Sequence, residues 1–398
     1  MIEETLAPVI YLDHNATTPI APEVADAMEP YMRTEYGNPS SDHVLGRRAR
    51  LAVEEAREQV ATLIGADPEE IVFTSGGTES NNMAIRGVAA MAPESRRRIV
   101  ISAVEHPATT APSALLEASG FLVTRLPIGR SGSLDLATAA AAIGDNVSLL
   151  SVMLAQNETG ALMPVAELAA AARDRGAITH TDAAQAIGKI PVSIAELKVD
   201  LLSIAGHKFY GPKGVGALYI RRGTPLSPLV VGASQERGMR PGTENVAGIV
   251  GLGTAARLAV SRLMDDHLRI AKLRDDLWKA LSTKISGVIR HTPKEACLPN
   301  TLLVSFPGVL GADVLARIPQ LAASTGSACH AGEYAPNATL IALGAPLDVA
   351  LGAVRLSLGR ATTAGEIAKA AELLADAYQT TISTNSPGPN ARKGNVSK

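Results

Sequence analysis

The chain has 398 residues, a formal net charge of −2 and a hydrophobic content of 46%. This length allows one to three domains and a large core. The balanced charge and the aromatic content of only 3% argue against a nucleic-acid-binding surface. No segment has the pattern of a signal peptide or of a membrane span, so we expect a cytoplasmic protein with no membrane partner.

Apolar runs rich in β-forming residues alternate with amphipathic stretches between residues 70 and 220. This alternation indicates an α/β fold in which helices cover both faces of a mostly parallel sheet. The runs that we expect to form strands are 71–74, 99–103, 121–125, 147–154, 177–181, 201–205 and 215–220.

A long helical pattern follows from Glu244 to about Ser286, with a break expected near Gly251 to Gly253. Later strands and a closing helix indicate a smaller α+β domain, and the polar C-terminal tail lacks apolar residues to bury. We therefore predict a large domain at 16–260, a small domain made of 1–15 and 261–380, and a disordered tail at 381–398.

Asp182 and Lys208 each follow one of the expected strands. If those strands are parallel neighbours, the carboxylate and the amine emerge at the same edge of the sheet. A pyridoxal phosphate enzyme needs both groups, because a lysine forms a Schiff base and a carboxylate keeps the pyridine nitrogen protonated. The pair alone is also consistent with a helix-capping aspartate and a solvent-facing lysine.

Further polar groups follow the other expected strands. Gly77 and Thr78 open a helix directly after a strand, an arrangement that suits a phosphate group. His106 could stack on a cofactor ring and move protons, or it could be an ordinary loop residue. The amides of Asn157 and Gln185 could hydrogen-bond to a cofactor oxygen, or they could serve turns and caps.

Two side chains near the C-terminal end could handle a substrate. Arg355 alternates with apolar residues in an expected strand, and a guanidinium is a natural bidentate partner of an α-carboxylate, although a salt bridge is the alternative. Cys329 is surrounded by small residues, which indicates an accessible thiol able to carry sulfur as a persulfide. We expect Cys329 and Cys297 both to be free thiols.

Together these segments resemble the class V aminotransferases and, within that group, the cysteine desulfurases. The resemblance runs from Tyr11-Leu12-Asp13-His14-Asn15-Ala16-Thr17-Thr18 to Arg360-Ala361-Thr362-Thr363 and includes residues 37–41 and 235–245. It implies a fold-type I, pyridoxal 5'-phosphate-dependent transferase that removes sulfur from L-cysteine to give L-alanine. No resident metal is implied.

The resemblance also implies a role for each candidate residue. Lys208 would carry the cofactor, Asp182 would pair with the pyridine nitrogen, and His106 would stack on the ring. Arg355 would bind the substrate carboxylate together with Asn157, and Cys329 would attack the sulfur. Gln185 and Asn157 would lie near the phenolic oxygen, and the phosphate would be held by Gly77, Thr78, His207 and, from the other subunit of a homodimer, Thr243.

Ala205 departs from the family pattern, in which a serine often contacts the phosphate at this position. A similar departure occurs in selenocysteine lyases, so L-selenocysteine stays open as a substrate. A true aminotransferase would not explain the placement of Cys329, and a non-catalytic sulfur-transfer scaffold would not need Lys208. The sulfur acceptor is open; it could belong to iron–sulfur cluster assembly, to the synthesis of thiolated tRNA or of cofactors, or to the sulfur modification of DNA.

Overall fold

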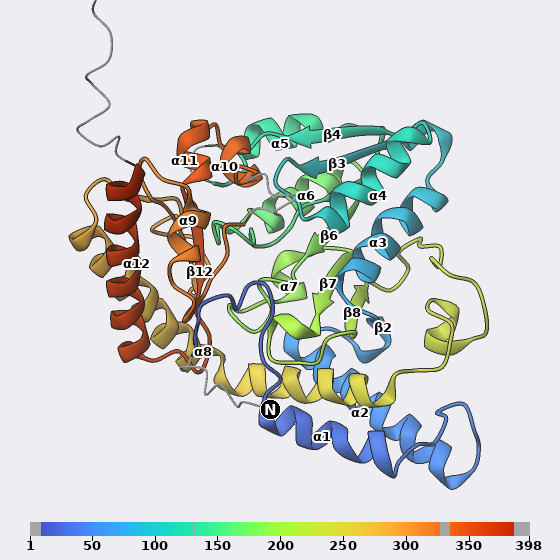
Figure 1. Ribbon diagram of the computed structural model, residues 1–398. Helices are drawn as coiled ribbons and strands as arrows, with labels where there is room; N and C mark the ends of the chain where they lie inside the picture. The colour runs from blue at the N-terminus through green and yellow to red at the C-terminus, as the bar shows by residue number, and fades with distance from the viewer. Residues whose placement is uncertain (1–8, 130–131, 327–334, 386–398) are drawn as a thin grey trace, which may run out of the picture.

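The computed structural model describes residues 9–129, 132–326 and 335–385 (Figure 1). Its main feature is a seven-stranded sheet in the order β2-β8-β7-β6-β5-β3-β4. Only β8 runs antiparallel to its neighbours, which confirms the predicted α/β fold with a mostly parallel sheet. The strands are β2 (Ile71–Thr74), β3 (Arg98–Ser102), β4 (Leu122–Leu126), β5 (Val147–Ser151), β6 (Ile178–Asp182), β7 (Leu201–Ala205) and β8 (Gly216–Ile220).

Helices cover both faces of this sheet, because the strands are apolar on both sides. On one face Val72 and Leu218 pack against Met83 and Ile85 of α3 (Gly77–Met91). The other face is covered by α2 (Val44–Ile64), α6 (Val165–Asp174) and the first half of α8 (Val246–Lys284). Smaller helices complete this body: α1 (Pro22–Arg33), α4 (Pro107–Ala118), α5 (Leu136–Ala142) and α7 (Ile194–Leu197).

The long helix α8 is continuous, so the break expected near Gly251 is wrong. A Cβ atom at Gly251 would lie 2.6 Å from Met28 Sδ, and one at Gly253 would lie 2.6 Å from Ala56 Cα. These glycines therefore let α8 pack closely on α1 and α2 instead of ending the helix. By length and composition α8 could cross a membrane, but 56% of its most apolar window is buried inside the protein.

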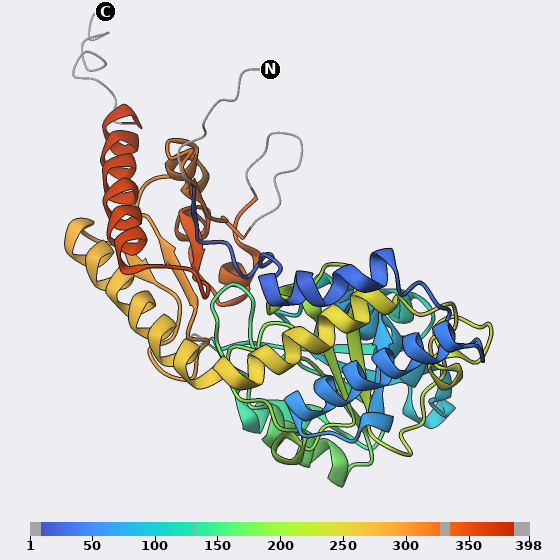
Figure 2. The same ribbon diagram turned by 90° about the horizontal axis from the view of Figure 1, so that it is seen from below.

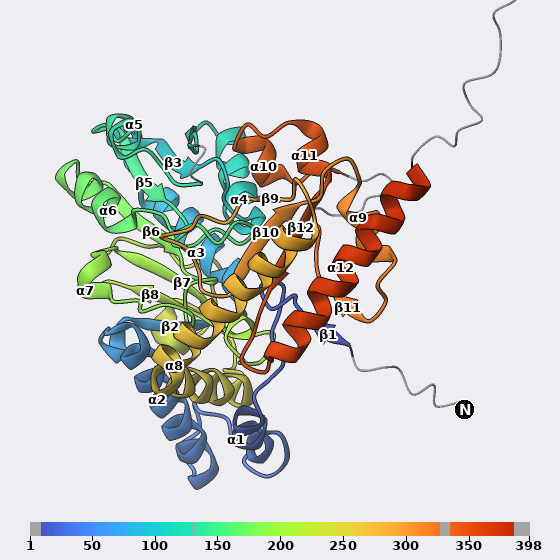
Figure 3. The same ribbon diagram turned by 90° about the vertical axis from the view of Figure 1, so that its left-hand side faces the viewer.

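A second apolar core lies around the far half of α8, which runs beside α12 (Ala364–Asn385) in Figures 2 and 3. It packs on a three-stranded antiparallel sheet of β9 (Ile289–Arg290), β10 (Thr301–Ser305) and β12 (Ala353–Ser357). Near it β1 (Ile10–Tyr11) pairs in parallel with β11 (Leu321–Ala322). The short helices here are α9 (Gly311–Ala316), α10 (Ala338–Ala342) and α11 (Leu347–Leu351).

Helix α12 is longer than expected, since it continues to Asn385. The segment 381–385 is therefore helical, and the prediction of a disordered tail from residue 381 is wrong for it. Thr381 is buried, and its hydroxyl donates a hydrogen bond to the carbonyl of Ala377 at 2.7 Å, which explains how a polar residue continues the helix here.

Candidate active site

The carboxyl ends of β6 and β7 meet the N-terminal segment at a cavity of about 360 Å³. The two strands are parallel neighbours, as the placement of Asp182 and Lys208 required. The cavity is lined by Asn15, Ala16, Gly77, Thr78, His106, Ala108, Met153, Ala155, Asn157, Asp182, Ala184, Gln185, Ala205, His207, Lys208 and Arg355. Most of the side chains singled out from the sequence are thus brought together.

Asp182 ends β6 and is buried. Its two carboxylate oxygens accept hydrogen bonds from Asn81 Nδ2 at 2.7 Å and from the backbone N–H of Ala184 at 2.9 Å. Within the described part of the chain no lysine or arginine forms an ion pair with it. The cavity therefore has a fixed carboxylate at its wall that can take a cationic donor from a bound molecule.

Lys208 lies in the turn Gly206–Lys208 that follows β7. Its Nζ donates hydrogen bonds of 2.8 Å to the backbone carbonyls of Asn15 and Ala16. Burial, assisted by Arg355, lowers the pKa of Lys208 to about 8, although Asp182 opposes this. About a tenth of the amine is therefore unprotonated at pH 7, far more than for an ordinary lysine, and a nucleophilic lysine requires this unprotonated form.

Gly77 and Thr78 begin α3, whose first N–H groups have no partner within the helix. The preceding Gly76 has φ +143°, a conformation that side chains disfavour, and a Cβ at Gly77 would lie 3.4 Å from the Cβ of Ala205. Ala205 therefore faces the helix start and offers no hydroxyl there.

Two histidines flank the cavity. His106 caps α4 by accepting a hydrogen bond at Nδ1 from the backbone of Ala108 at 3.1 Å, which leaves Nε2 for a proton. Burial lowers the pKa of His106, although Asp182 opposes this. His207 Nδ1 lies 3.1 Å from Thr17 Oγ1, and burial together with Lys208 lowers its pKa to about 4. Both imidazoles are therefore neutral at pH 7.

Gln185 is buried, and both ends of its amide are engaged. Nε2 donates to the carbonyl of Asn15 at 2.9 Å, and Oε1 accepts from Lys189 Nζ at 2.6 Å. The carbonyl of Asn15 thus accepts from both Gln185 and Lys208. The sequence alone assigns no role to Asn15.

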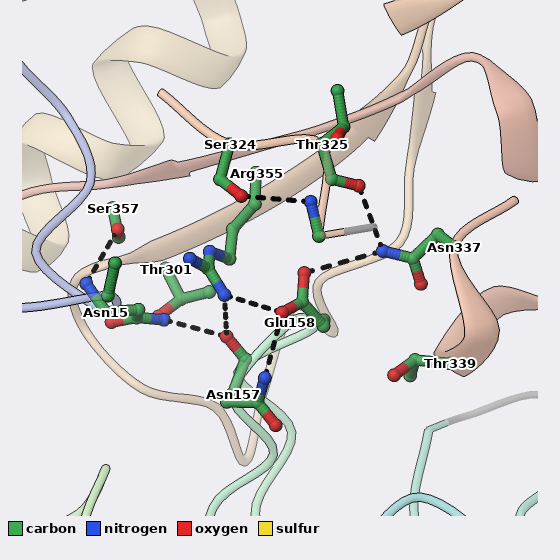
Figure 4. A network of polar contacts seen from close by, with 12 residues as sticks. Asn15, Asn157, Glu158, Thr301, Ser324, Thr325, Asn337, Thr339, Arg355 and Ser357 are labelled. Atoms are coloured by element: carbon green, nitrogen blue, oxygen red, sulfur yellow. Dashed lines mark hydrogen bonds and ion pairs between the residues drawn. The ribbon is translucent and has the colours of Figure 1, made fainter. Parts of the chain in front are cut away.

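Arg355 is the centre of the network in Figure 4, where its guanidinium points toward Glu158. Nη1 donates to Glu158 Oε1 at 2.5 Å and to the carbonyl of Asn157 at 3.2 Å, and Nη2 donates to Asp13 Oδ1 at 2.9 Å. Nε is buried and has no partner among the described residues. Arg355 also lines the cavity, so its guanidinium can reach the carboxylate of a bound molecule through the N–H of Nη2 that has no partner among the described residues.

Glu158 connects Arg355 to the segment that ends at Gly326. Asn157 Nδ2 donates to Glu158 Oε1 at 2.8 Å, and Asn337 Nδ2 approaches both Glu158 Oε2 at 3.4 Å and the carbonyl of Thr325 at 3.3 Å (Figure 4). A Cβ at Gly326 would lie 2.0 Å from Glu158 Oε2, so this position requires glycine. Burial raises the pKa of Glu158, and Arg355 opposes that rise.

Three further residues of interest in the sequence are Cys329, Thr243 and Cys297. Cys329 falls outside the described residues, between Gly326 and Asn337. Thr243 is exposed and does not line the cavity. Cys297 is a free thiol, as expected, and Arg274 Nη1 donates to its sulfur at 3.2 Å.

Sequence reasoning assigned no role to Asn15, Glu158 or Lys189, although all three hold side chains of the cavity. Glu158 directly follows the noted Asn157, which could have drawn attention to it. Lys189 follows Gln185 by four positions, a spacing that lets side chains meet in helical or turn backbone. No local pattern marks Asn15.

Comparisons with known proteins agree with this arrangement. The aminotransferase class-V family matches residues 10–369. A cysteine desulfurase IscS from Dictyoglomus turgidum is 46% identical over 356 residues, which cover 89% of this chain and 90% of that protein. A solved structure of a NifS-like protein has a TM-score of 0.88 at 36% identity and covers 94% of this chain and 100% of its own. The solved structure of SspA in complex with cysteine has a TM-score of 0.79 at 34% identity and covers 87% of this chain and 98% of its own.

Proposed function

Because the chain belongs to the class-V aminotransferase family, we propose that it is a cysteine desulfurase that uses pyridoxal 5'-phosphate to convert L-cysteine to L-alanine. The observation that carries this proposal is the convergence of Lys208, Asp182 and Arg355 on one cavity. A lysine, a carboxylate and a carboxylate-binding arginine are the groups that an amino-acid enzyme with this cofactor needs.

The cavity residues fit the cofactor. Asp182 is a buried carboxylate without a cation among the described residues, and a protonated pyridine nitrogen would supply one. The N–H groups at the start of α3, with Thr78, would hold the phosphate. His106 would stack on the ring, His207 would lie at the phosphate, and Gln185 and Asn157 would lie near the phenolic oxygen. When bound, the cofactor supplies an electron-withdrawing ring that makes the substrate Cα acidic.

Lys208 has two tasks in this proposal. It holds the cofactor covalently between turnovers, and as a free amine it takes the proton from the substrate Cα. Its lowered pKa serves both tasks, because the unprotonated amine is the nucleophile and the base. The carbonyls of Asn15 and Ala16 receive the amine when it is not bonded to the cofactor.

Arg355 orients the substrate. Glu158, Asp13 and the carbonyl of Asn157 occupy Nη1 and one position on Nη2, so the guanidinium is fixed before the substrate arrives. The second N–H of Nη2, which has no partner among the described residues, is left for the α-carboxylate of L-cysteine. Such pre-organisation lowers the entropy cost of binding in a reactive orientation.

Cys329 is the proposed sulfur acceptor. Its thiolate attacks the substrate sulfur, so the S–S bond of a persulfide forms while the substrate Cβ–S bond breaks; the electron pair of that bond stays on the carbon fragment, which is protonated and leaves as L-alanine. That sulfur then passes to an acceptor protein such as an iron–sulfur scaffold. The active species is a homodimer, in which the exposed Thr243 of one chain reaches the phosphate of the other. We place the enzyme in the cytoplasm.

The test is alanine release by the purified protein loaded with pyridoxal phosphate, with L-cysteine and L-selenocysteine compared in parallel. Turnover of L-cysteine with a persulfide trapped on Cys329 is the expected result. Lys208→Ala abolishes turnover, whereas Cys329→Ser retains the cofactor absorbance and loses the persulfide. Turnover of L-selenocysteine alone would refute the desulfurase and favour a selenocysteine lyase, and absence of cofactor binding would refute both.

A further inference from the structure

A second lysine lies next to the cavity and has no task in the proposed reaction. Lys189 lies in the turn after β6, and its amine reaches the protein interior. There Nζ donates to Gln185 Oε1 at 2.6 Å and to Asn15 Oδ1 at 3.2 Å. Burial, together with the positive charges of Lys208 and Arg355, holds the pKa of Lys189 well below its usual value. Placing a lysine here is costly, so a specific benefit is to be expected.

The benefit lies at Gln185, whose amide can adopt two orientations of similar shape. Lys189 Nζ donates to Oε1, and the carbonyl of Asn15, which can only accept, holds Nε2, so both contacts favour the same orientation of the amide. The second hydrogen of Nε2 has no partner among the described residues, and Gln185 lines the cavity. The amide therefore presents a donor, not an acceptor, to a bound molecule.

The side-chain orientation of Asn15 depends less on Lys189 than that of Gln185 does. Its Oδ1 also accepts from Asn300 Nδ2 at 3.0 Å, and its Nδ2 donates to Thr301 Oγ1 at 2.8 Å. For Gln185 Oε1, in contrast, Lys189 is the hydrogen-bond donor that the described residues supply. Loss of Lys189 should therefore act mainly through Gln185.

We infer that Lys189 is a positioning residue that locks the amide of Gln185 with its nitrogen toward the phenolic oxygen of the cofactor. This inference rests on the proposed function, because it takes Gln185 to lie beside that oxygen. Lys189 itself touches neither the cofactor nor the substrate in this scheme. Its contribution is the hydrogen bond to Gln185 Oε1, which opposes rotation of the amide to the alternative orientation.

The test is a double-mutant cycle on cofactor affinity. The Kd of pyridoxal phosphate is measured by absorbance titration of the apoprotein for the wild type, Lys189→Met, Gln185→Ala and the double variant. Lys279→Met, on the exposed side of α8, is the matched control, and circular dichroism checks that each variant is folded.

Gln185→Ala should weaken binding about 10- to 100-fold, as expected for a hydrogen bond to a charged oxygen. Lys189→Met should weaken it about 2- to 10-fold, as expected for one neutral hydrogen bond. The double variant should bind no more weakly than Gln185→Ala, because Lys189 acts through Gln185. Lys279→Met should leave the Kd unchanged.

Three results would overturn the inference, each in a distinguishable way. An unchanged Kd in Lys189→Met with a weakened Gln185→Ala removes the role of Lys189 and leaves the Gln185 contact intact. Multiplying effects in the double variant show that Lys189 acts independently of Gln185. An unchanged Kd in Gln185→Ala removes the proposed contact to the phenolic oxygen, and the inference falls with it.

Discussion

Replacing Glu158 by glutamine should destabilise the protein and disturb its substrate site together. Every described partner of this carboxylate is a donor, namely Arg355 Nη1 at 2.5 Å, Asn157 Nδ2 at 2.8 Å and Asn337 Nδ2 at 3.4 Å. A glutamine side chain has only one oxygen, so its amide nitrogen must face a donor whichever way it points. The lowest-cost arrangement keeps the oxygen on Arg355 and turns the nitrogen toward Asn337.

The magnitude follows from what remains after the substitution. Removing one partner of a buried ion pair costs about 3–5 kcal/mol when the other charge is left alone. Here Asp13 still pairs with Arg355 at 2.9 Å and the amide oxygen still accepts, so we expect about 1.5–3 kcal/mol, the contribution of a charged hydrogen bond. The kcat/KM for L-cysteine should fall while the cofactor absorbance stays normal, since Arg355 is less well aligned.

The assay is equilibrium urea unfolding of the apoprotein, with kinetics measured on the loaded enzyme. Glu23→Gln is the matched control, because Glu23 pairs with Arg262 at 2.8 Å on the surface, where such a pair contributes less than about 1 kcal/mol. If Glu158→Gln unfolds at the same urea concentration as the control and keeps its kcat/KM, the reasoning about Arg355 is refuted.

Three further predictions concern neighbouring features. Gly326→Ala should lower activity sharply because its Cβ would lie 2.0 Å from Glu158 Oε2, whereas Gly344→Ala, which has a similar positive φ but open space around it, should cost activity little; equal losses would contradict the steric argument. Burial raises the pKa of Glu105 to about 8, so the folded state binds more protons than the unfolded state between about pH 4.5 and 8. The free energy of unfolding of the wild type should therefore fall as the pH rises through that window, relative to that of Glu105→Gln, in urea titrations at each pH. A difference between the two proteins that stays constant with pH would refute this. The rate of cofactor incorporation into the apoprotein, followed by absorbance, should rise about tenfold per pH unit and level off near pH 8, where Lys208 loses its proton; a flat profile would contradict the lowered pKa.

The placement of Asp182 and Lys208 could be predicted because the strands before them can be recognised from the local sequence. Each residue ends a short apolar run, and parallel neighbours bring their carboxyl ends to one edge. The same logic located Arg355 in a strand with a buried side chain. In these cases a local pattern and a general rule of sheet topology were enough.

The supporting residues could not be predicted, because their partners are distant in the chain. Lys189 donates a hydrogen bond to Asn15, which lies 174 positions away in the sequence, and Arg355 pairs with Asp13, which lies 342 positions away. The prediction of a break in α8 was wrong for a related reason. Gly251 reads locally as a helix breaker, and only the position of Met28 shows that it serves close helix packing.

Asn15 has a consequence for how the molecule is made. It precedes two of its partners by hundreds of residues: its backbone N–H donates to Ser357 Oγ at 2.9 Å across 342 positions, and its Nδ2 donates to Thr301 Oγ1. The carbonyl that receives Lys208 can therefore be fixed only after Ser357 has been synthesised. A nascent or truncated chain can form the large sheet and still lack the finished lysine pocket, so synthesis itself delays the appearance of a reactive amine in its working position.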